Sequence, residues 1–343
     1  MHYLVTGHTG FKGTWLTLML HHLGATVSGV ALDPEPGSLF DRVGGPSFLE
    51  SDLRVDVRNF EDLNNVFKTV KPDVVVHLAA RPLVRESYLE PRETVETNVT
   101  GTLNVLEASQ SSPNLQARLI VTTDKVYQPR HDAMAFIEED PLGGIDLYSA
   151  SKSMADVLTT AWATSLGGCP TATARAGNVI GGGDISNERL MPDILSALQR
   201  GEDPAIRMPN AVRPWQHVLD CLNGYIHLID FLVAGQDTSP FAGAWNFGPD
   251  ESTPIPVSRV VSETARAWGL EPKWNQQSIS DLRESDFLML DSSKARGSLN
   301  WRSSLSFQQS IGLTVEWERR TLGGSDPLDV TREQINHFFS PGA

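Results

Sequence analysis

Short apolar runs rich in β-branched residues recur along the first half of the chain, and stretches with helical periodicity separate them. The runs expected to form strands are residues 3–6, 26–32, 73–78, 119–123 and 171–174. The stretches expected to form helices are residues 15–23, 60–70, 95–109 and 148–165. Strands that alternate with helices predict a parallel sheet covered by helices on both faces. The predicted fold class is therefore α/β, with a Rossmann-like doubly wound sheet.

The pattern changes after about Gly181, where glycines and prolines divide the chain into shorter pieces. We expect a smaller, mixed C-terminal lobe there, which binds substrate. The predicted division is a nucleotide-binding domain at residues 1–180 with a returning segment at about 214–248, and a lobe made of residues 181–213 and 249–343. The Pro/Gly-rich stretch at residues 234–243 is expected to be a surface loop.

Composition and charge exclude several classes of function. With 343 residues, 40% hydrophobic and 20% charged, the chain has the composition of a soluble globular protein with one large or two modest domains. A net charge of -14 argues against a nucleic-acid partner. No signal segment or membrane-length apolar run is evident, so we expect no membrane association and a cytoplasmic location. Cys169 and Cys221 lack the spacing of a metal site or disulfide framework, so no metal is predicted.

A glycine-rich loop follows the first predicted strand and opens the next helical stretch. Its residues are Gly7, His8, Thr9, Gly10, Phe11, Lys12 and Gly13. Glycines at such a place allow backbone N–H groups to approach a pyrophosphate at the helix N-terminus. The G-x-x-G-x-x-G spacing is not the commonest fingerprint, so a purely structural turn stays open, but the strand–loop–helix context favours a dinucleotide. Lys12 could approach a phosphate or lie over the surface, and it leaves room for a phosphorylated cofactor.

Two aspartates are candidates for binding the adenosine of that dinucleotide. Asp33 follows the second strand at about the distance of a ribose-binding acid, although a solvated loop aspartate is a comparable alternative. Asp56, at the end of a predicted short strand at residues 54–57, is a carboxylate that can accept from an adenine amino group.

The densest set of reactive side chains follows the strand at residues 119–123. Thr123, Asp124 and Lys125 supply a hydroxyl, a carboxyl and an amine, while Tyr148 and Lys152 share one face of the next helix. An ammonium near a phenol lowers its pKa toward that of a general base. This set can oxidise an alcohol and then eliminate water beside the new ketone. A surface ion pair and a solvated helix face are the structural alternatives.

With these motifs the sequence resembles the extended short-chain dehydrogenase/reductase family and, within it, the CDP-glucose 4,6-dehydratases. The resemblance runs nearly end to end. Beyond the glycine loop and the Tyr-x-x-x-Lys pair, it includes HLAA at 77–80, PLVR at 82–85, TNV at 97–99, TTDK at 122–125, PLGG at 141–144, ARAGNVIGGGD at 174–184, RLMPD at 189–193, RPWQHV at 213–218 and LDSSKA at 290–295. Related dTDP-sugar dehydratases have a glutamate where this chain has Lys125, which points to the cytidylyl branch.

The resemblance implies dehydration of CDP-D-glucose to CDP-4-keto-6-deoxy-D-glucose, with internally recycled NAD. Tyr148, supported by Lys152 and beside Thr123, is expected to take the proton from the sugar O4. Lys125 then removes the C5 proton, and Asp124 protonates the departing C6 hydroxyl. NAD is favoured over NADP because internal hydride return suits a tightly held oxidised cofactor.

The expected ligand contacts come from both predicted domains. Cofactor contacts are expected from Gly7, Thr9, Gly10, Phe11, Lys12, Gly13, Asp33, Asp56, Val57, Leu78, Ala79, Ala80, Asn98, Thr122, Tyr148 and Lys152. Nucleotide-sugar contacts are expected from Arg85, Asn178, Arg189, Arg207, Arg213 and His217. Guanidinium groups suit the diphosphate, although any one of these arginines could instead be a surface residue.

Departures from the family pattern leave the exact nucleotide and sugar open. They stand at Arg81, Pro129, Ile137 with its neighbour Phe136, and Ile185. The alternatives are another nucleotide-sugar 4,6-dehydratase or a 4-epimerase and, more remotely, a non-catalytic nucleotide sensor. In resembling enzymes the helices corresponding to residues 95–109 and 148–165 pack against a second subunit. A homodimer or homotetramer is therefore expected, unless those residues only cover the sheet.

Overall fold

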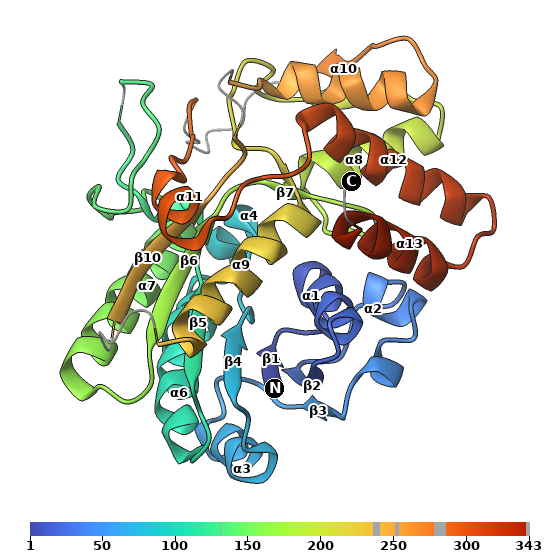
Figure 1. Cartoon of the computed structure of the whole chain (residues 1–343). Helices are drawn as coiled ribbons and strands as arrows, with labels where there is room; N and C mark the ends of the chain where they lie inside the picture. The colour runs from blue at the N-terminus through green and yellow to red at the C-terminus, as the bar shows by residue number, and fades with distance from the viewer. Residues whose placement is uncertain (131, 236–240, 251–253, 278–285, 341–343) are drawn as a thin grey trace.

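A seven-stranded parallel sheet is the central feature of residues 1–130, 132–235, 241–250, 254–277 and 286–340, which the computed structural model describes (Figure 1). Its strand order is β10-β6-β5-β4-β1-β2-β3. The strands are β1 (His2–Thr6), β2 (Thr26–Ala31), β3 (Ser51–Arg54), β4 (Val74–His77), β5 (Ala117–Val121), β6 (Thr171–Ala176) and β10 (Phe241–Phe247). Each neighbouring pair is parallel, which confirms the predicted fold class.

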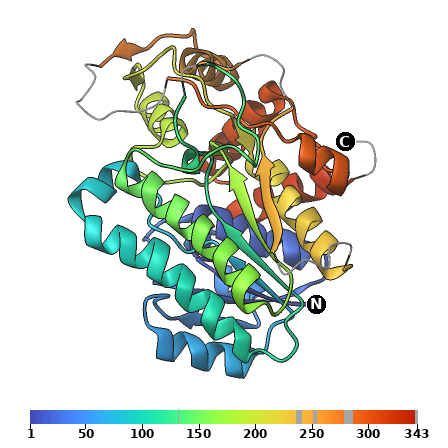
Figure 2. The same ribbon diagram turned by 90° about the vertical axis from the view of Figure 1, so that its left-hand side faces the viewer.

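Helices cover both faces of the sheet, as Figure 2 shows for the face that carries α6 and α7. The covering helices are α1 (Phe11–His22) and α9 (Val218–Val233) on one face, and α3 (Phe60–Val70), α6 (Gly101–Ala108) and α7 (Leu147–Leu166) on the other. In β1, Tyr3 and Val5 join the apolar cluster that contains α1 and α9, whereas Leu4 joins the cluster of α3 and α6. Because both faces are buried, the strands read as continuous apolar runs rather than as alternating ones.

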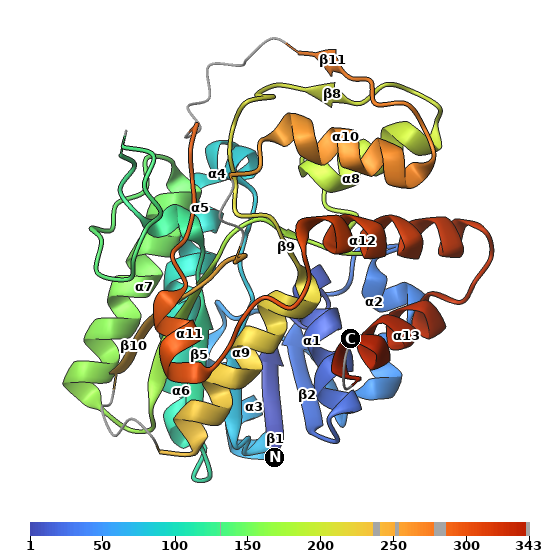
Figure 3. The same ribbon diagram turned by 45° about the horizontal axis from the view of Figure 1, so that its top comes forward.

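The smaller lobe lies beyond the carboxyl ends of the strands (Figure 3). Its core joins α8 (Leu190–Gln199), α10 (Val257–Trp268) and α12 (Phe307–Leu322) with Ile206 and Trp215. Two short ladders complete it: β7 (Val179–Ile180) with β9 (Gln216–His217), and β8 (Ala205–Ile206) with β11 (Asn275–Gln276). In open α/β sheets ligands bind outside the carboxyl ends of the strands, so the lobe faces the expected site.

The C-terminal helices of the chain contact both the sheet domain and the lobe. Of the C-terminal helices, α11 (Ser293–Leu299) contacts β10 and α9, and α13 (Pro327–Phe339) contacts α1 and α2 (Leu39–Arg42). Helix α11 therefore packs beside the sheet, whereas α13 packs against α12 of the lobe as well as against α1 and α2. The predicted loop at residues 234–243 is also shorter than expected, because residues 241–243 open β10 while residues 236–240 lie outside the described residues.

The predicted helix at residues 95–109 is a composite of short pieces. Its pieces are α5 (Pro91–Val95), the π turn η2 (Glu96–Thr100), α6 and the 3-10 turn η3 (Ser109–Ser111). Together these pieces cover the predicted range and extend beyond it at both ends, from Pro91 to Ser111. Other short elements of the chain are α4 (Val84–Leu89) and the 3-10 turns η1 (Gly45–Phe48) and η4 (Asp124–Val126). Across the described residues, every helix is too short or too polar to cross a bilayer.

Candidate active site

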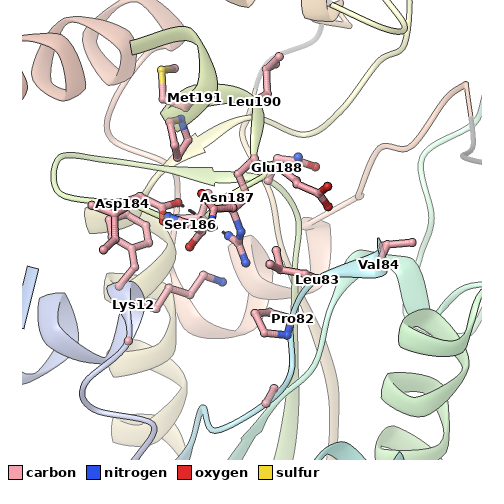
Figure 4. A pocket seen from close by; sticks show the side chains of 18 of the residues that line it. Lys12, Pro82, Leu83, Val84, Asp184, Ser186, Asn187, Glu188, Leu190 and Met191 are labelled. Atoms are coloured by element: carbon pink, nitrogen blue, oxygen red, sulfur yellow. Dashed lines mark hydrogen bonds and ion pairs between the residues drawn. The ribbon is translucent and has the colours of Figure 1, made fainter. Parts of the chain in front are cut away.

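A cavity of about 1210 Å³ separates the carboxyl ends of the strands from the lobe. Its walls come from the glycine loop, the residues after β4 and β5, the first turns of α7, and the segment from Ala176 to Asp193. Figure 4 shows Lys12 of the glycine loop pointing into this space, opposite Pro82 and Leu83. Segments distant in sequence therefore converge on one site.

The glycine loop has the shape of a dinucleotide cradle. Gly7 has φ +75°, and a Cβ there would lie 2.7 Å from the backbone nitrogen of Ala79. A Cβ on Gly13 would lie 2.1 Å from the carbonyl oxygen of Gly7. At the start of α1, Gly10 supplies no side-chain cap, and the first helical turn carries no acidic residue. The free N–H groups and the positive end of this helix therefore fit a pyrophosphate.

The adenosine candidates both line the cavity, but each already has a cationic partner. Asp33 lies 3.3 Å from Arg54, and its side chain is 90% exposed. Asp56 lies two residues beyond β3 and accepts from the backbone N–H and the guanidinium of Arg58. Burial alone would raise the pKa of Asp56, yet these hydrogen bonds hold the pKa below its ordinary value. Both carboxyls thus offer acceptor oxygens at the edge of the cleft.

The turn after β5 presents the predicted acid and base to the cavity. Thr123 caps η4: its hydroxyl accepts from the N–H of Lys125 at 3.4 Å and donates to Oδ1 of Asp124 at 3.0 Å. The other carboxyl oxygen, Oδ2 of Asp124, is buried and finds no hydrogen-bond partner in the described part of the chain. Burial raises the pKa of Asp124, while the charge of Lys125 opposes the rise. A carboxyl so placed holds its proton more strongly than an exposed aspartate does, as a general acid requires.

Gly177 is a site residue that sequence reasoning did not single out. A Cβ there would lie 2.2 Å from Cγ of Pro214 and 2.9 Å from Oδ2 of Asp124. Only glycine therefore leaves room for the free carboxyl oxygen. Its place in the ARAGNV stretch was the available signal, but the close approach is a tertiary contact.

Tyr148 and Lys152 lie on the first turns of α7, which begins where Asp146 accepts from the N–H of Ser149 at 2.8 Å. Both side chains are buried and line the cavity. Burial raises the pKa of Tyr148 to about 12, although hydrogen bonding to Thr123 opposes the rise. Burial lowers the pKa of Lys152 to about 8, and the charge of Lys12 adds to this.

The expected support of Tyr148 by the Lys152 ammonium is not seen in this geometry. Nζ of Lys152 donates to the backbone carbonyl of Val121 at 2.7 Å. Burial is therefore the largest influence on the pKa of the Tyr148 phenol, which lies above rather than below its ordinary value. Hydrogen bonding to the hydroxyl of Thr123 and the charge of Arg189 both oppose the rise in the pKa of Tyr148.

The predicted diphosphate cations also line the cavity, together with Asn178. They are Arg85, Arg189, Arg207 and Arg213. Arg85 forms an ion pair with Glu188 at 2.8 Å, and Arg189 lies 4.0 Å from Asp184. The cavity wall therefore combines four guanidinium groups with carboxylates that an anionic ligand can displace.

Two predicted contacts, Asn98 and His217, need correction because both are buried and neither lines the cavity. Asn98 accepts from the N–H of Arg81 at 2.8 Å and donates to Oγ of Ser151 at 2.8 Å, so it joins the end of β4 to α7. The helical path through η2 turns Asn98 inward and leaves Thr97 at the cavity wall. His217 caps α9 by accepting from the N–H of Leu219 at 3.3 Å, and burial lowers the pKa of its ring to about 3.

Of the four departures from the family pattern, only Arg81 and Ile185 line the cavity. The guanidinium of Arg81 is held by Glu86, Glu90 and Glu93, which belong to α4, α5 and the junction between them. The described cavity wall does not include Pro129 or Ile137. The structure therefore limits the altered part of the pocket to two positions.

Asp124→Asn should raise the free energy of unfolding at neutral pH by on the order of 1 kcal/mol. Because burial raises the pKa of Asp124, the folded chain holds the carboxyl proton to a higher pH than the unfolded chain does. Stability is lost as pH rises from the unfolded pKa of about 4 through the raised folded pKa, and an amide avoids that loss. Urea unfolding should show the gain at neutral pH and no gain below about pH 4. A less stable variant at neutral pH would mean that the attraction of nearby cations outweighs burial.

Known proteins are similar to this chain in both sequence and fold. Residues 3–243 match the NAD dependent epimerase/dehydratase family. The chain is 39% identical to CDP-glucose 4,6-dehydratase of Salmonella typhimurium (strain LT2) over 345 residues, which cover 98% of this chain and 95% of that protein.

Many solved structures share the fold, and two of them show the degree of likeness. A dTDP-glucose 4,6-dehydratase from Bacillus anthracis in complex with NAD superposes with a TM-score of 0.79 at 24% identity, covering 96% of this chain and 99% of that one. A UDP-glucose 4-epimerase from Bifidobacterium longum in complex with NAD⁺ and UDP has a TM-score of 0.82 at 22% identity, covering 95% of this chain and 100% of that one.

Proposed function

The chain belongs to the NAD dependent epimerase/dehydratase family, and on this premise we propose that it is an NAD-dependent CDP-glucose 4,6-dehydratase. The reaction converts CDP-D-glucose into CDP-4-keto-6-deoxy-D-glucose with loss of water. The observation that carries the proposal is the convergence of Thr123, Asp124, Lys125 and Tyr148 on one cavity that also holds a dinucleotide cradle. An enzyme that only oxidises the alcohol needs the hydroxyl groups of Tyr148 and Thr123, but it does not need Asp124 or Lys125.

The first step is oxidation of the sugar at C4. Tyr148 removes the proton of the C4 hydroxyl, and Thr123 hydrogen-bonds to the same oxygen. The glycine loop would hold NAD, which would accept the hydride from C4 and later return it to C6. Lys152 fixes the first turns of α7 through its bond to Val121, which keeps the phenol at the cavity wall.

The second step eliminates water across C5 and C6. The new C4 ketone acidifies the C5 hydrogen, and the amine of Lys125 takes it as a proton. The electron pair forms the C5–C6 double bond while the C6–O bond breaks. Asp124, whose pKa is raised by burial, gives its proton to the leaving hydroxyl, which departs as water. Return of hydride to C6 and of the proton to C5 completes the 4-keto-6-deoxy sugar.

The nucleotide diphosphate is bound by the guanidinium groups of the lobe. Arg213 is 7% exposed and Arg189 stands at the start of α8, both at the cavity wall. Steady-state kinetics with CDP-glucose, dTDP-glucose and UDP-glucose tests the substrate, and CDP-glucose should give the highest kcat/KM. A higher kcat/KM for either of the other sugars would reassign the enzyme to another nucleotide-sugar dehydratase or, if C6 keeps its oxygen, to a 4-epimerase.

The enzyme is further proposed to be a cytoplasmic homodimer or homotetramer built on the face of α6 and α7. In the single chain Met154, Val157 and Leu166 of α7 are 43%, 55% and 59% exposed. Burying such side chains between subunits removes apolar surface from water. Sedimentation velocity at micromolar concentration should give a dimer or tetramer, and a monomer would contradict the assignment.

A further inference from the structure

A fully buried polar network lies behind the turn that carries the acid and the base. Arg175 of β6 donates to both carboxyl oxygens of Asp156 on α7, through Nε at 2.9 Å and Nη2 at 2.8 Å. Arg175 and Asp156 are 3% and 0% exposed. A buried ion pair of this kind adds little net stability over an apolar pair of the same volume, so its presence raises the question of another role.

The ion pair is connected to both ends of the turn η4. On the N-terminal side, the hydroxyl of Thr122 donates to Oδ2 of Asp156 at 3.0 Å. On the C-terminal side, Nη1 of Arg175 donates to the hydroxyl of Tyr127 at 2.9 Å, and Tyr127 is the residue that ends η4. Asp124 and Lys125 therefore lie on a short segment whose two flanking residues are tied to one buried ion pair.

Tyr127 extends the network to the far strand of the sheet. Its hydroxyl donates to Oδ1 of Asn246 on β10 at 2.6 Å, and Asn246 donates to the carbonyl of Phe136 at 2.9 Å. Burial raises the pKa of Tyr127 far above neutral, so the phenol stays protonated and donates. The ring also stacks on Phe136, with centroids 4.7 Å apart.

Helix α7 carries the phenol of Tyr148 at one end of this arrangement and Asp156 two turns later. The same helix also holds the carbonyl of Val126 in η4 through Oγ of Ser153 at 2.8 Å. The network thus sets the position of the acid and base relative to the helix that bears the oxidising tyrosine. Misplacement of a reacting group by about 1 Å can cost on the order of a hundredfold in rate.

We propose that the Asp156–Arg175 ion pair and Tyr127 are positioning residues for the elimination step, holding Asp124 and Lys125 in register with the sugar already oxidised at C4. This inference rests on the proposed function. The oxidation step depends less on the network, because Tyr148 is fixed by the start of α7 through Asp146 and through Lys152.

Tyr127→Phe is the sharpest test, because it removes one hydroxyl and leaves the ring stack and the ion pair in place. With CDP-glucose in a single turnover, elimination should slow by about tenfold or more, while oxidation at C4 changes by less than about twofold. Quenched samples should therefore accumulate the 4-keto sugar that still carries its C6 hydroxyl, and solvent deuterium at C5 should appear late. NAD binding at equilibrium should equal that of the wild type.

Tyr3→Phe is the matched control, since Tyr3 is also a buried tyrosine, at 3% exposed on β1, and should leave both steps unchanged. Arg175→Lys supplies a second variant should Tyr127→Phe fold poorly. It keeps a cation beside Asp156, but a single amine cannot reproduce the guanidinium contacts to Tyr127 and to the carbonyl of Glu138. In Arg175→Lys, as in Tyr127→Phe, elimination should slow markedly while oxidation at C4 changes little.

Parallel loss of both steps, or no change in either, would overturn the positioning role. A wild-type chain that dehydrates a different nucleotide sugar would refute the proposed substrate only, and the ratio of the two steps can then be measured on that sugar. A wild-type chain that oxidises but never eliminates would refute the dehydratase assignment and the positioning role together.

Discussion

Tyr148→Phe should lower turnover of CDP-glucose by about 10²- to 10⁴-fold, the usual range for losing a general base. Phenylalanine keeps the ring on the first turn of α7 but cannot take the proton of the C4 hydroxyl. Since every later step needs the C4 ketone, oxidation and elimination should fall by the same factor. Rapid-quench analysis of the sugar, with and without the substitution, measures both.

The matched control is the binding of NAD and of CDP-glucose, which should change little because the hydroxyl of Tyr148 bonds to the hydroxyl of Thr123 rather than to the cradle. If Tyr148→Phe were indistinguishable from the wild type in every turnover assay, the alternative of a non-catalytic nucleotide sensor would be favoured instead.

Lys125→Met should slow only the elimination step, whereas Tyr148→Phe slows both steps. Elimination should fall by about 10²- to 10⁴-fold because the C5 proton loses its base, whereas formation of the C4 ketone should remain within a few-fold of the wild type. Solvent deuterium should therefore fail to enter C5 while the 4-keto sugar accumulates. Mass spectrometry of quenched reactions in deuterated water measures both quantities.

Lys125→Arg separates charge from basicity at the same position. A guanidinium keeps the positive charge beside Asp124 but does not lose its proton in proteins, so it cannot serve as the base. The arginine variant should be as slow in elimination as the methionine variant. Full elimination activity in either would place the base elsewhere, and survival of C4 epimerisation alone would favour the 4-epimerase alternative.

Sequence reasoning succeeded where the signal is local. The pattern predicts a helix at residues 60–70, and α3 has these bounds because Asn59 caps its N-terminus and Leu63, Val66 and Phe67 form one buried face. The position of the turn η4 is equally local, since Thr123, Asp124 and Lys125 follow the end of a buried strand and line the cavity.

Sequence reasoning failed where the outcome depends on which side of a segment faces the ligand. Within the RPWQHV stretch, Arg213 faces the cavity, but His217 turns toward the first turn of α9. In the same way Thr97 lines the cavity whereas Asn98 faces inward. Motif membership places such residues near a site without fixing the direction of each side chain.

The buried network could not be read from sequence for a different reason. Tyr127 and Arg175 are 48 positions apart, and Tyr127 and Asn246 are 119 apart. Their contact depends on β5, β6 and β10 being neighbours in the sheet, with β10 returning from beyond the first part of the lobe. The coupling of the turn η4 to α7 is thus a property of the assembled fold.

The most direct test of the central claim follows the hydrogens of the sugar through one complete turnover. Purified protein with NAD should convert CDP-glucose deuterated at C4, in ordinary water, into a 4-keto-6-deoxy sugar that carries the deuterium at C6. The same reaction in deuterated water should place solvent deuterium at C5, with the cofactor oxidised at the end. A product that keeps its C6 oxygen, or whose C6 deuterium is absent, would contradict the dehydratase mechanism.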